Sequence, residues 1–291
     1  MYVDPALYAA ILAMFQQLVL NDPTRFEAVD IARVMDSSNH WWIDRFALIY
    51  NTAQDATNAL AAALDWRKSF GINHFTDTDF ANIYATGNVL FVVKARSIFF
   101  TFLFIKQKGI FTNTLLDKDG RRVLYVRLSQ LQPLTLNYNR TLYEQALAHL
   151  INSLDLNTPA YEAWTSLADA TAIDAVNNVD LFFYNDFIKI MEKYFPLGWK
   201  NVMCVNVPVT MTAVVQQVTL AMSQQMKDRI RFLYYNCIGG TTGCDIADND
   251  IRNYMNEDQI PQNIKSATTI DLILGNFLGL GFYFNQLPLI G

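Results

Sequence analysis

The sequence predicts an α/β protein in which a helical N-terminal segment precedes a sheet domain. Two Asp-Pro pairs in the first third of the chain, Asp4-Pro5 and Asp22-Pro23, are typical of helix starts. Between residues 121 and 205, apolar runs of strand length alternate with helical patterns. Hydrophobic residues make up 52% of the 291 residues and charged ones only 17%, so apolar side chains exceed what a core needs.

The N-terminal region, residues 1–86, is expected to form a small helical bundle. Capping residues and apolar spacing predict helices at about 5–20, 23–35, 41–50 and 53–70. The last of these is rich in alanine and ends before Gly71. We expect Trp66 to anchor this helix to the following domain, and Arg67 to form a structural ion pair rather than a ligand contact.

An apolar segment at about 87–109 interrupts this pattern. Its centre, Val89–Ile105, is almost wholly apolar but contains Lys94 and Arg96. A transmembrane helix needs about 20 predominantly apolar residues, and charges at its centre cost a few kcal/mol each. We therefore expect no membrane span here. Three interpretations stay open: an extra buried element, a membrane-contacting element, or translated non-coding sequence.

The sheet domain begins with a turn at Asp117-Lys118-Asp119-Gly120. Beyond it the sequence predicts a strand over 121–128, a helix over 140–154, a strand over 164–170, a helical stripe of Phe183, Phe187, Ile190 and Tyr194, and a strand over 202–205. Asp169, at the end of the second strand, is expected to cap a turn. A short helix is expected at 246–255.

The stretch from 201 to 226 contains no charged residue. A helix over 209–222 would carry an apolar face and an opposite face that is polar but uncharged. The apolar face consists of Met211, Val214, Val215, Val218 and Met222, and the other of Thr210, Thr212, Gln216, Thr219 and Ser223. A surface helix usually shows charges to water. We interpret this one as a cover over an apolar space.

Several function classes are disfavoured by the sequence. The net charge of −5 and the pI of about 5.2 argue against general nucleic-acid binding. The three cysteines, at 204, 237 and 244, form no metal-binding or redox spacing and are expected to be free thiols. No GxSxG, P-loop or HExxH motif occurs, and the three histidines lie on unrelated segments. We therefore expect no enzyme, no metal site and no signal peptide.

An ordered set of short motifs resembles the CRAL-TRIO lipid-binding family, over about 40–86 and 108–262. The matches are Arg45-Phe46, Trp66-Arg67, Gly120-Arg121-Arg122-Val123, Asp169 with Asn178-Val179-Asp180, the Tyr194–Pro196 turn, Asn206-Val207-Pro208, Lys227-Asp228-Arg229 and Ile260-Pro261. Members that transfer phosphatidylinositol have Glu-Arg directly after the Tyr-Pro turn, where this chain has Leu197-Gly198. Recognition of an inositol headgroup is therefore not implied.

The resemblance implies a mixed, mostly parallel sheet over 110–262, an apolar pocket and a gate helix over 209–222. It also implies a lipid as ligand and no other cofactor. The candidate lipid-binding residues are Leu124, Val126, Leu167, Met203, Val205, Met211, Val214, Val215, Val218 and Met222. Lys227 and Arg229 are the candidates for contact with an acidic headgroup, because arginine presents a planar fork to phosphate.

Two functions follow from this resemblance. The preferred one is non-enzymatic binding, and possible transfer between membranes, of a phospholipid or other hydrophobic small molecule by a cytoplasmic protein that visits membranes transiently. The alternative is a membrane-associated adaptor that retains the fold and recruits a protein partner. That adaptor would use 89–105 or residues 266–291 of the unassigned apolar tail, 263–291, as its anchor.

Overall fold

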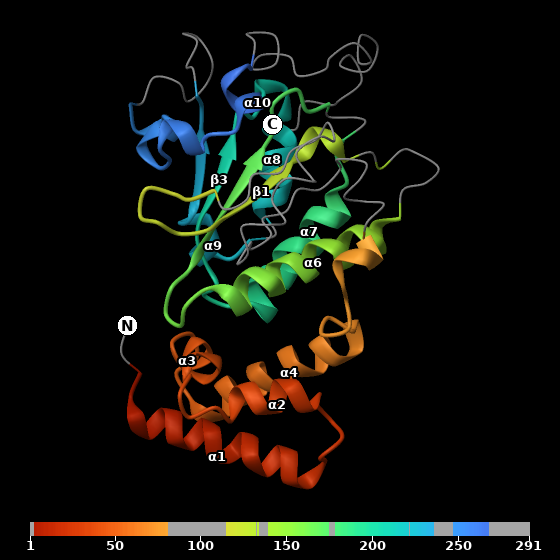
Figure 1. Ribbon diagram of the computed structural model, residues 1–291, viewed down its shortest axis with the longest axis vertical. Coiled ribbons are helices and arrows are strands. Elements are labelled where there is room, and N and C mark those ends of the chain that lie inside the picture. The colour runs from red at the N-terminus through yellow and green to blue at the C-terminus, as the bar shows by residue number, and fades with distance from the viewer. Residues whose placement is uncertain are drawn as a thin grey trace, which may run out of the picture.

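The computed structural model describes residues 3–80, 115–131, 133, 139–174, 178–220, 222–235 and 247–267. Within them, a bundle of helices packs against one end of an α/β layer (Figure 1). The expected apolar segment at 87–109 and the tail beyond residue 267 lie outside the described residues.

The bundle consists of α1 (Pro5–Asn21), α2 (Ala28–Val34), α3 (Trp41–Ala47) and α4 (Ala53–Phe70). α1 begins as predicted, because the Asp4 carboxylate accepts the N–H of Ala6 and a proline occupies the first helical position. α4 begins where the Thr52 hydroxyl accepts the N–H of Asp55, and it ends at Gly71, whose φ is +75°.

The second helix begins later than predicted, at Ala28 instead of residue 23. The Asp22 carboxylate accepts hydrogen bonds from the backbone N–H and the hydroxyl of Thr24, so it closes a tight turn and does not cap a helix. The turn lets Phe26 enter the bundle core, where it stacks on Phe15.

The sheet contains β1 (Val123–Arg127), β2 (Trp164–Asp169), β3 (Trp199–Val205) and β4 (Ile230–Leu233), in that spatial order. All three pairings between these strands are parallel, whereas the prediction was a mixed, mostly parallel sheet. The predicted turn before β1 is present, and Asp117 accepts the N–H groups of Asp119 and Arg121 within it. The predicted α/β fold class is confirmed.

Each face of the sheet has its own cover (Figure 1). One face is covered by α6 (Arg140–Asn157), α7 (Leu181–Lys189) with its continuation Ile190–Tyr194, and α8 (Thr212–Leu220) followed by α9 (Gln224–Lys227). The other face packs on a C-terminal segment of 3-10 turns, Ala247–Asn249, Ile251–Asn253 and Glu257–Gln259, and on α10 (Gln262–Lys265). The first two of these turns lie where a helix was predicted over 246–255.

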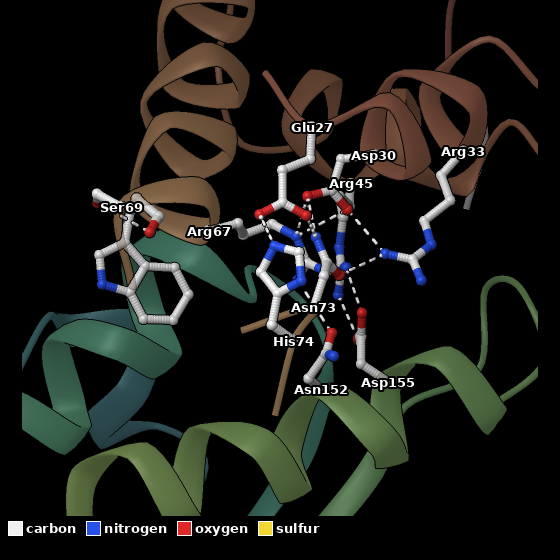
Figure 2. Close-up of polar contacts among 11 residues, drawn as sticks. Glu27, Asp30, Arg33, Arg45, Arg67, Ser69, Asn73, His74, Asn152 and Asp155 are labelled. Atoms are coloured by element: carbon white, nitrogen blue, oxygen red, sulfur yellow. Dashed lines mark hydrogen bonds and ion pairs between the residues drawn. The ribbon is translucent and has the colours of Figure 1, made fainter. Parts of the chain in front are cut away.

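The bundle is joined to the α/β layer by buried polar contacts and stacked rings. Arg67 of α4 pairs with Asp30 and donates to the Asn152 side chain of α6 at 3.0 Å (Figure 2). The Trp66 ring stacks on Tyr194, with 4.2 Å between ring centroids and 5° between ring planes. The predicted structural pairing of Arg67 and the predicted anchoring by Trp66 are both confirmed.

Candidate functional site

A void lies between the sheet and the helices α7 and α8. Its volume is about 150 Å³. The void is lined by Val126, Leu128, Leu147, Ser166, Ala168, Ala170, Ile173, Phe183, Tyr184, Phe187, Ile188, Trp199, Val202, Cys204, Val207, Met211, Val214, Val215, Val218, Thr219, Met222, Met226, Ile230 and Phe232. Protein cores are normally close-packed, so a space of this size needs an explanation.

Small side chains on the central strand β2 create the void. Alternate residues of a strand point to the same face of a sheet, and on this face β2 presents Ser166 and Ala168, followed by Ala170 just past its end. These short side chains do not reach the facing helices. As a result Ala168, and Val202 and Cys204 on the neighbouring central strand, are only half-buried, where a filled core would bury them completely.

The lining carries no charge. Among the described residues, no acidic or basic side chain borders the void, and its polar groups include hydroxyls and a thiol. Burial raises the pKa of the Cys204 thiol to about 12 and also raises the pKa of Tyr184, whose hydroxyl donates to the Asn178 carbonyl at 3.3 Å. Both groups are neutral at physiological pH, so the space suits an uncharged hydrocarbon.

The structure brings together six of the ten candidate lipid-binding residues around this void: Val126, Met211, Val214, Val215, Val218 and Met222. Leu124 is not among the lining residues, although it belongs to the same buried cluster, together with Leu150 and Ile151 of α6. Leu167, Met203 and Val205 lie on the opposite face of the sheet, where they pack with Ile251 and Met255. These four residues therefore do not border the void.

The misplacement has a physical cause. A parallel sheet that is covered on both faces carries apolar side chains on both, so hydrophobicity does not distinguish the face that borders a void. The residues that the sequence analysis missed include Ser166, Ala168, Ala170, Cys204 and Phe232. The run of small side chains at alternate positions of β2 was the available signal. Phe183 and Phe187 were noticed as a helical stripe, and they line the void as well.

α8 lies over the void and turns two different faces to its surroundings. Val214, Val215 and Val218 face inward, whereas the exposed face carries Ala213, Gln216, Gln217 and Leu220, the last of them 72% exposed. The segment after α8 is fixed by Glu192, whose carboxylate accepts both the N–H and the hydroxyl of Ser223 at 3.0 and 2.6 Å. The helix thus covers the void without an ionised side chain on either face.

A second, more polar hollow lies beside the void. Its volume is about 180 Å³, and it is lined by Phe46, Ile49, Tyr50, Glu192, Lys193, Pro196, Leu197, Trp199, Ser223, Gln225, Met226 and Arg229. Trp199 and Met226 border both spaces, so these two side chains form part of the wall between them.

Arg229 is the half-buried cation of this hollow. One of its terminal nitrogens donates to the Trp199 carbonyl at 2.8 Å, and no acidic side chain of the described residues lies within ion-pair distance of it. Burial lowers the pKa of Arg229, which is the direction expected when a cation loses water without gaining an anion. Of the two headgroup candidates, Arg229 therefore lies at a hollow. Lys227 is exposed and does not border it.

The fold and the void define an α/β protein in which an apolar space lies between a parallel sheet and a short covering helix. The family model described as the CRAL/TRIO domain matches residues 106–265, and the chain belongs to this family. Membership supports lipid binding and lipid transfer in general, and proteins of the family generally bind hydrophobic small molecules such as lipids rather than catalyse reactions.

Among solved structures, the crystal structure of Sfh5 is similar to this chain. The match has a TM-score of 0.55 and 14% sequence identity, and it covers 80% of this chain and 82% of that chain. At this identity the similarity shows a shared fold alone. The comparison with curated proteins gives no match. Among the helices that the structure describes, none combines the length and apolar character needed to cross a membrane.

Proposed function

We propose that this protein binds a phospholipid or a similar lipid with its hydrocarbon chain in the void, and that it moves this lipid between membranes. The observation that carries the proposal is the uncharged void between the central strands and α8. Each methylene group that the void removes from water contributes about 0.8 kcal/mol, so one acyl chain supplies a large part of the binding free energy. Residues 1–86 serve as the helical N-terminal region and 110–262 as the lipid-binding domain.

Exchange of the lipid requires the void to open, and we assign this movement to α8 as a gate helix. Its outward face has no charged residue, so placing this face against a bilayer dehydrates few strongly hydrated groups. Opening at a membrane would let the lipid chain pass from the bilayer to the void without crossing water. We expect a cytoplasmic protein whose contact with membranes is peripheral and transient.

Arg229 is proposed to bind the acidic group of the lipid. It is half-buried, it lacks an acidic partner in the described part of the chain, and its hollow shares a wall with the void. A phosphate at this hollow would supply the missing anion. Because Leu197-Gly198 stands where inositol-lipid members carry Glu-Arg, we assign the phosphate contact and no inositol selectivity.

A finer relationship is also proposed. Trp66-Arg67-Lys68 and the turn Pro196-x-Gly198-x-Lys200 are most similar to the CRAL-TRIO half of motile sperm domain-containing protein two. The major-sperm-protein domain of that protein has no counterpart within residues 1–291. A phylogenetic tree of CRAL-TRIO sequences tests this relationship, and grouping of this chain with another branch would contradict it.

Lipid extraction tests the main proposal. The purified protein is extracted with organic solvent, and the extract is analysed by mass spectrometry. The stripped protein is then mixed with donor vesicles that contain a pyrene-labelled phospholipid, and movement to acceptor vesicles is followed by the loss of excimer fluorescence. We expect a copurifying lipid and protein-dependent transfer. Absence of both copurifying lipid and uptake from vesicles would contradict the proposal.

A further inference from the structure

The buried Arg45 of α3 joins three parts of the molecule. Its two terminal nitrogens each donate to one oxygen of Asp155 on α6 at 2.8 Å, and its Nε donates to the backbone carbonyl of Pro196 at 2.9 Å. The side chain is 1% exposed (Figure 2 shows Arg45 and Asp155 between the bundle and α6). A guanidinium in this position cannot touch a ligand in either hollow, so any effect on binding must act through its partners.

The partner of interest is the turn 195–198, which leads into β3. Leu197 in this turn has a φ of +59°, a conformation that is unfavourable for a residue with a side chain. Gly198 is tightly enclosed: a Cβ at this position would lie 3.0 Å from the Asp155 carboxylate and 3.2 Å from a terminal nitrogen of Arg45. The ion pair therefore fits against the backbone of the turn and holds a strained conformation in place.

The same turn builds the polar hollow. Pro196, Leu197 and Trp199 all line it, and the Trp199 carbonyl accepts the hydrogen bond from Arg229. Three bonded steps thus connect Arg45 to Arg229: the hydrogen bond to Pro196, the backbone from 196 to 199, and the hydrogen bond from Arg229 to Trp199.

From this geometry we propose that Arg45 is a positioning residue for recognition of an acidic headgroup. It fixes the turn that in turn orients the Arg229 guanidinium, so the N-terminal bundle forms part of the headgroup site. This inference rests on the proposed function, because it assumes that the ligand places a phosphate at Arg229.

Arg67 provides a matched control. It is likewise 1% exposed, it also pairs with a buried aspartate, and it also joins the bundle to α6 through Asn152. Within the described residues, its side chain donates hydrogen bonds to Asp30, Asn73 and Asn152, and its guanidinium lies 5.1 Å from the centre of the Trp42 ring; none of these belongs to the 195–198 turn. Loss of Arg67 therefore weakens the same interface without touching the hollow.

The test compares Arg45→Lys with Arg67→Lys. Lysine keeps the charge but lacks the planar fork that binds both Asp155 oxygens and the Pro196 carbonyl together.

Binding is measured with two pyrene-labelled probes in phosphatidylcholine vesicles. One is phosphatidic acid, and the other is the diacylglycerol with the same chains, which lacks the phosphate. The ratio of the two affinities isolates the phosphate contact. For Arg45→Lys we expect this ratio to fall about tenfold, the effect of losing one charge-assisted hydrogen bond. For Arg67→Lys we expect the same ratio of affinities as for the parent protein, even if the melting temperature of this variant is lower.

Arg229→Gln separates the possible failures. If neither probe binds to the parent protein, the proposed lipid function is wrong. If Arg229→Gln leaves the ratio unchanged, the phosphate assignment is wrong and the role of Arg45 is wrong with it. If Arg229→Gln lowers the ratio but Arg45→Lys matches Arg67→Lys, lipid binding stands and the inference is overturned. Should Arg45→Lys not fold, Gly198→Ala gives the same test. Its added carbon would lie 3.0 Å from the Asp155 carboxylate and 3.2 Å from both an Arg45 nitrogen and the Phe195 carbonyl, so the ion pair and the turn must shift apart while both charges remain. A ratio equal to that of the parent would again overturn the inference.

Discussion

Replacement of Ala168 by phenylalanine tests whether the void holds a lipid chain. Ala168 lies on the central strand β2 with its side chain at the void, between the sheet and α8. A phenyl ring there occupies space that an acyl chain would otherwise fill. It displaces roughly four methylene groups at about 0.8 kcal/mol each, which is about 3 kcal/mol or roughly two hundredfold in affinity.

The stability of the variant gives a second, independent expectation. A side chain added to a close-packed core costs typically about 1–3 kcal/mol, but a side chain that grows into an empty space meets no such resistance. Ala168→Phe should therefore keep or raise the melting temperature of the lipid-free protein. Ala146→Phe is the control, because Ala146 is completely buried and does not border the void. It should lose stability.

The assay combines thermal unfolding of the stripped proteins with titration of a pyrene-labelled phospholipid. We expect weak binding with retained stability for Ala168→Phe, and lower stability for Ala146→Phe. If Ala168→Phe binds the lipid with the affinity of the parent protein, the void does not hold the lipid chain. A loss of stability as large as that of the control would show that the space beside Ala168 is a filled core.

Three further predictions follow from other parts of the structure. Because burial raises the pKa of Cys204 to about 12, its alkylation by iodoacetamide should be slow at neutral pH and should accelerate as the pH rises toward that value. Bound lipid should slow the alkylation further. Fast labelling that does not depend on pH would contradict this prediction. Asp30→Ala leaves Arg67 buried without its acidic partner and should cost about 3–5 kcal/mol in urea unfolding. Asp65→Ala breaks a partly exposed pair with Arg25 and should cost only about 1 kcal/mol. Leu220→Asp places a charge on the exposed face of α8 and should slow lipid transfer between vesicles while leaving lipid affinity unchanged. Equal transfer rates for this variant and the parent protein would argue against membrane contact by this face.

Local signals in the sequence predicted much of the fold. The Asp4-Pro5 pair and the Thr52 and Gly71 caps set the ends of α1 and α4, because capping depends on residues within one turn of the helix end. The Asp22-Pro23 pair looked equivalent, but the carboxylate of Asp22 closed a turn instead. The turn is followed by Phe26, which is buried in the bundle core, and a motif of neighbouring residues contains no information on that burial.

The candidate site was predicted less completely. Residues of the covering helix were found, because an amphipathic helix shows its buried face in its spacing. The strand residues were assigned partly to the wrong face, since Leu167 and Met203 are as apolar as the side chains that border the void. The contacts of Arg45 with Asp155 and Pro196 join residues 110 and 151 positions apart, so no short-range motif could have shown them.

Anomalous diffraction from a bound brominated lipid locates the hydrocarbon chain within the protein. The protein is saturated with a phosphatidylcholine that is brominated along one acyl chain, crystallised, and measured at the bromine absorption edge. We expect bromine peaks between the small side chains of β2, at Ala168, and the inner face of α8, at Val215. Bromine peaks elsewhere, or protein side chains that fill this space, would contradict the account.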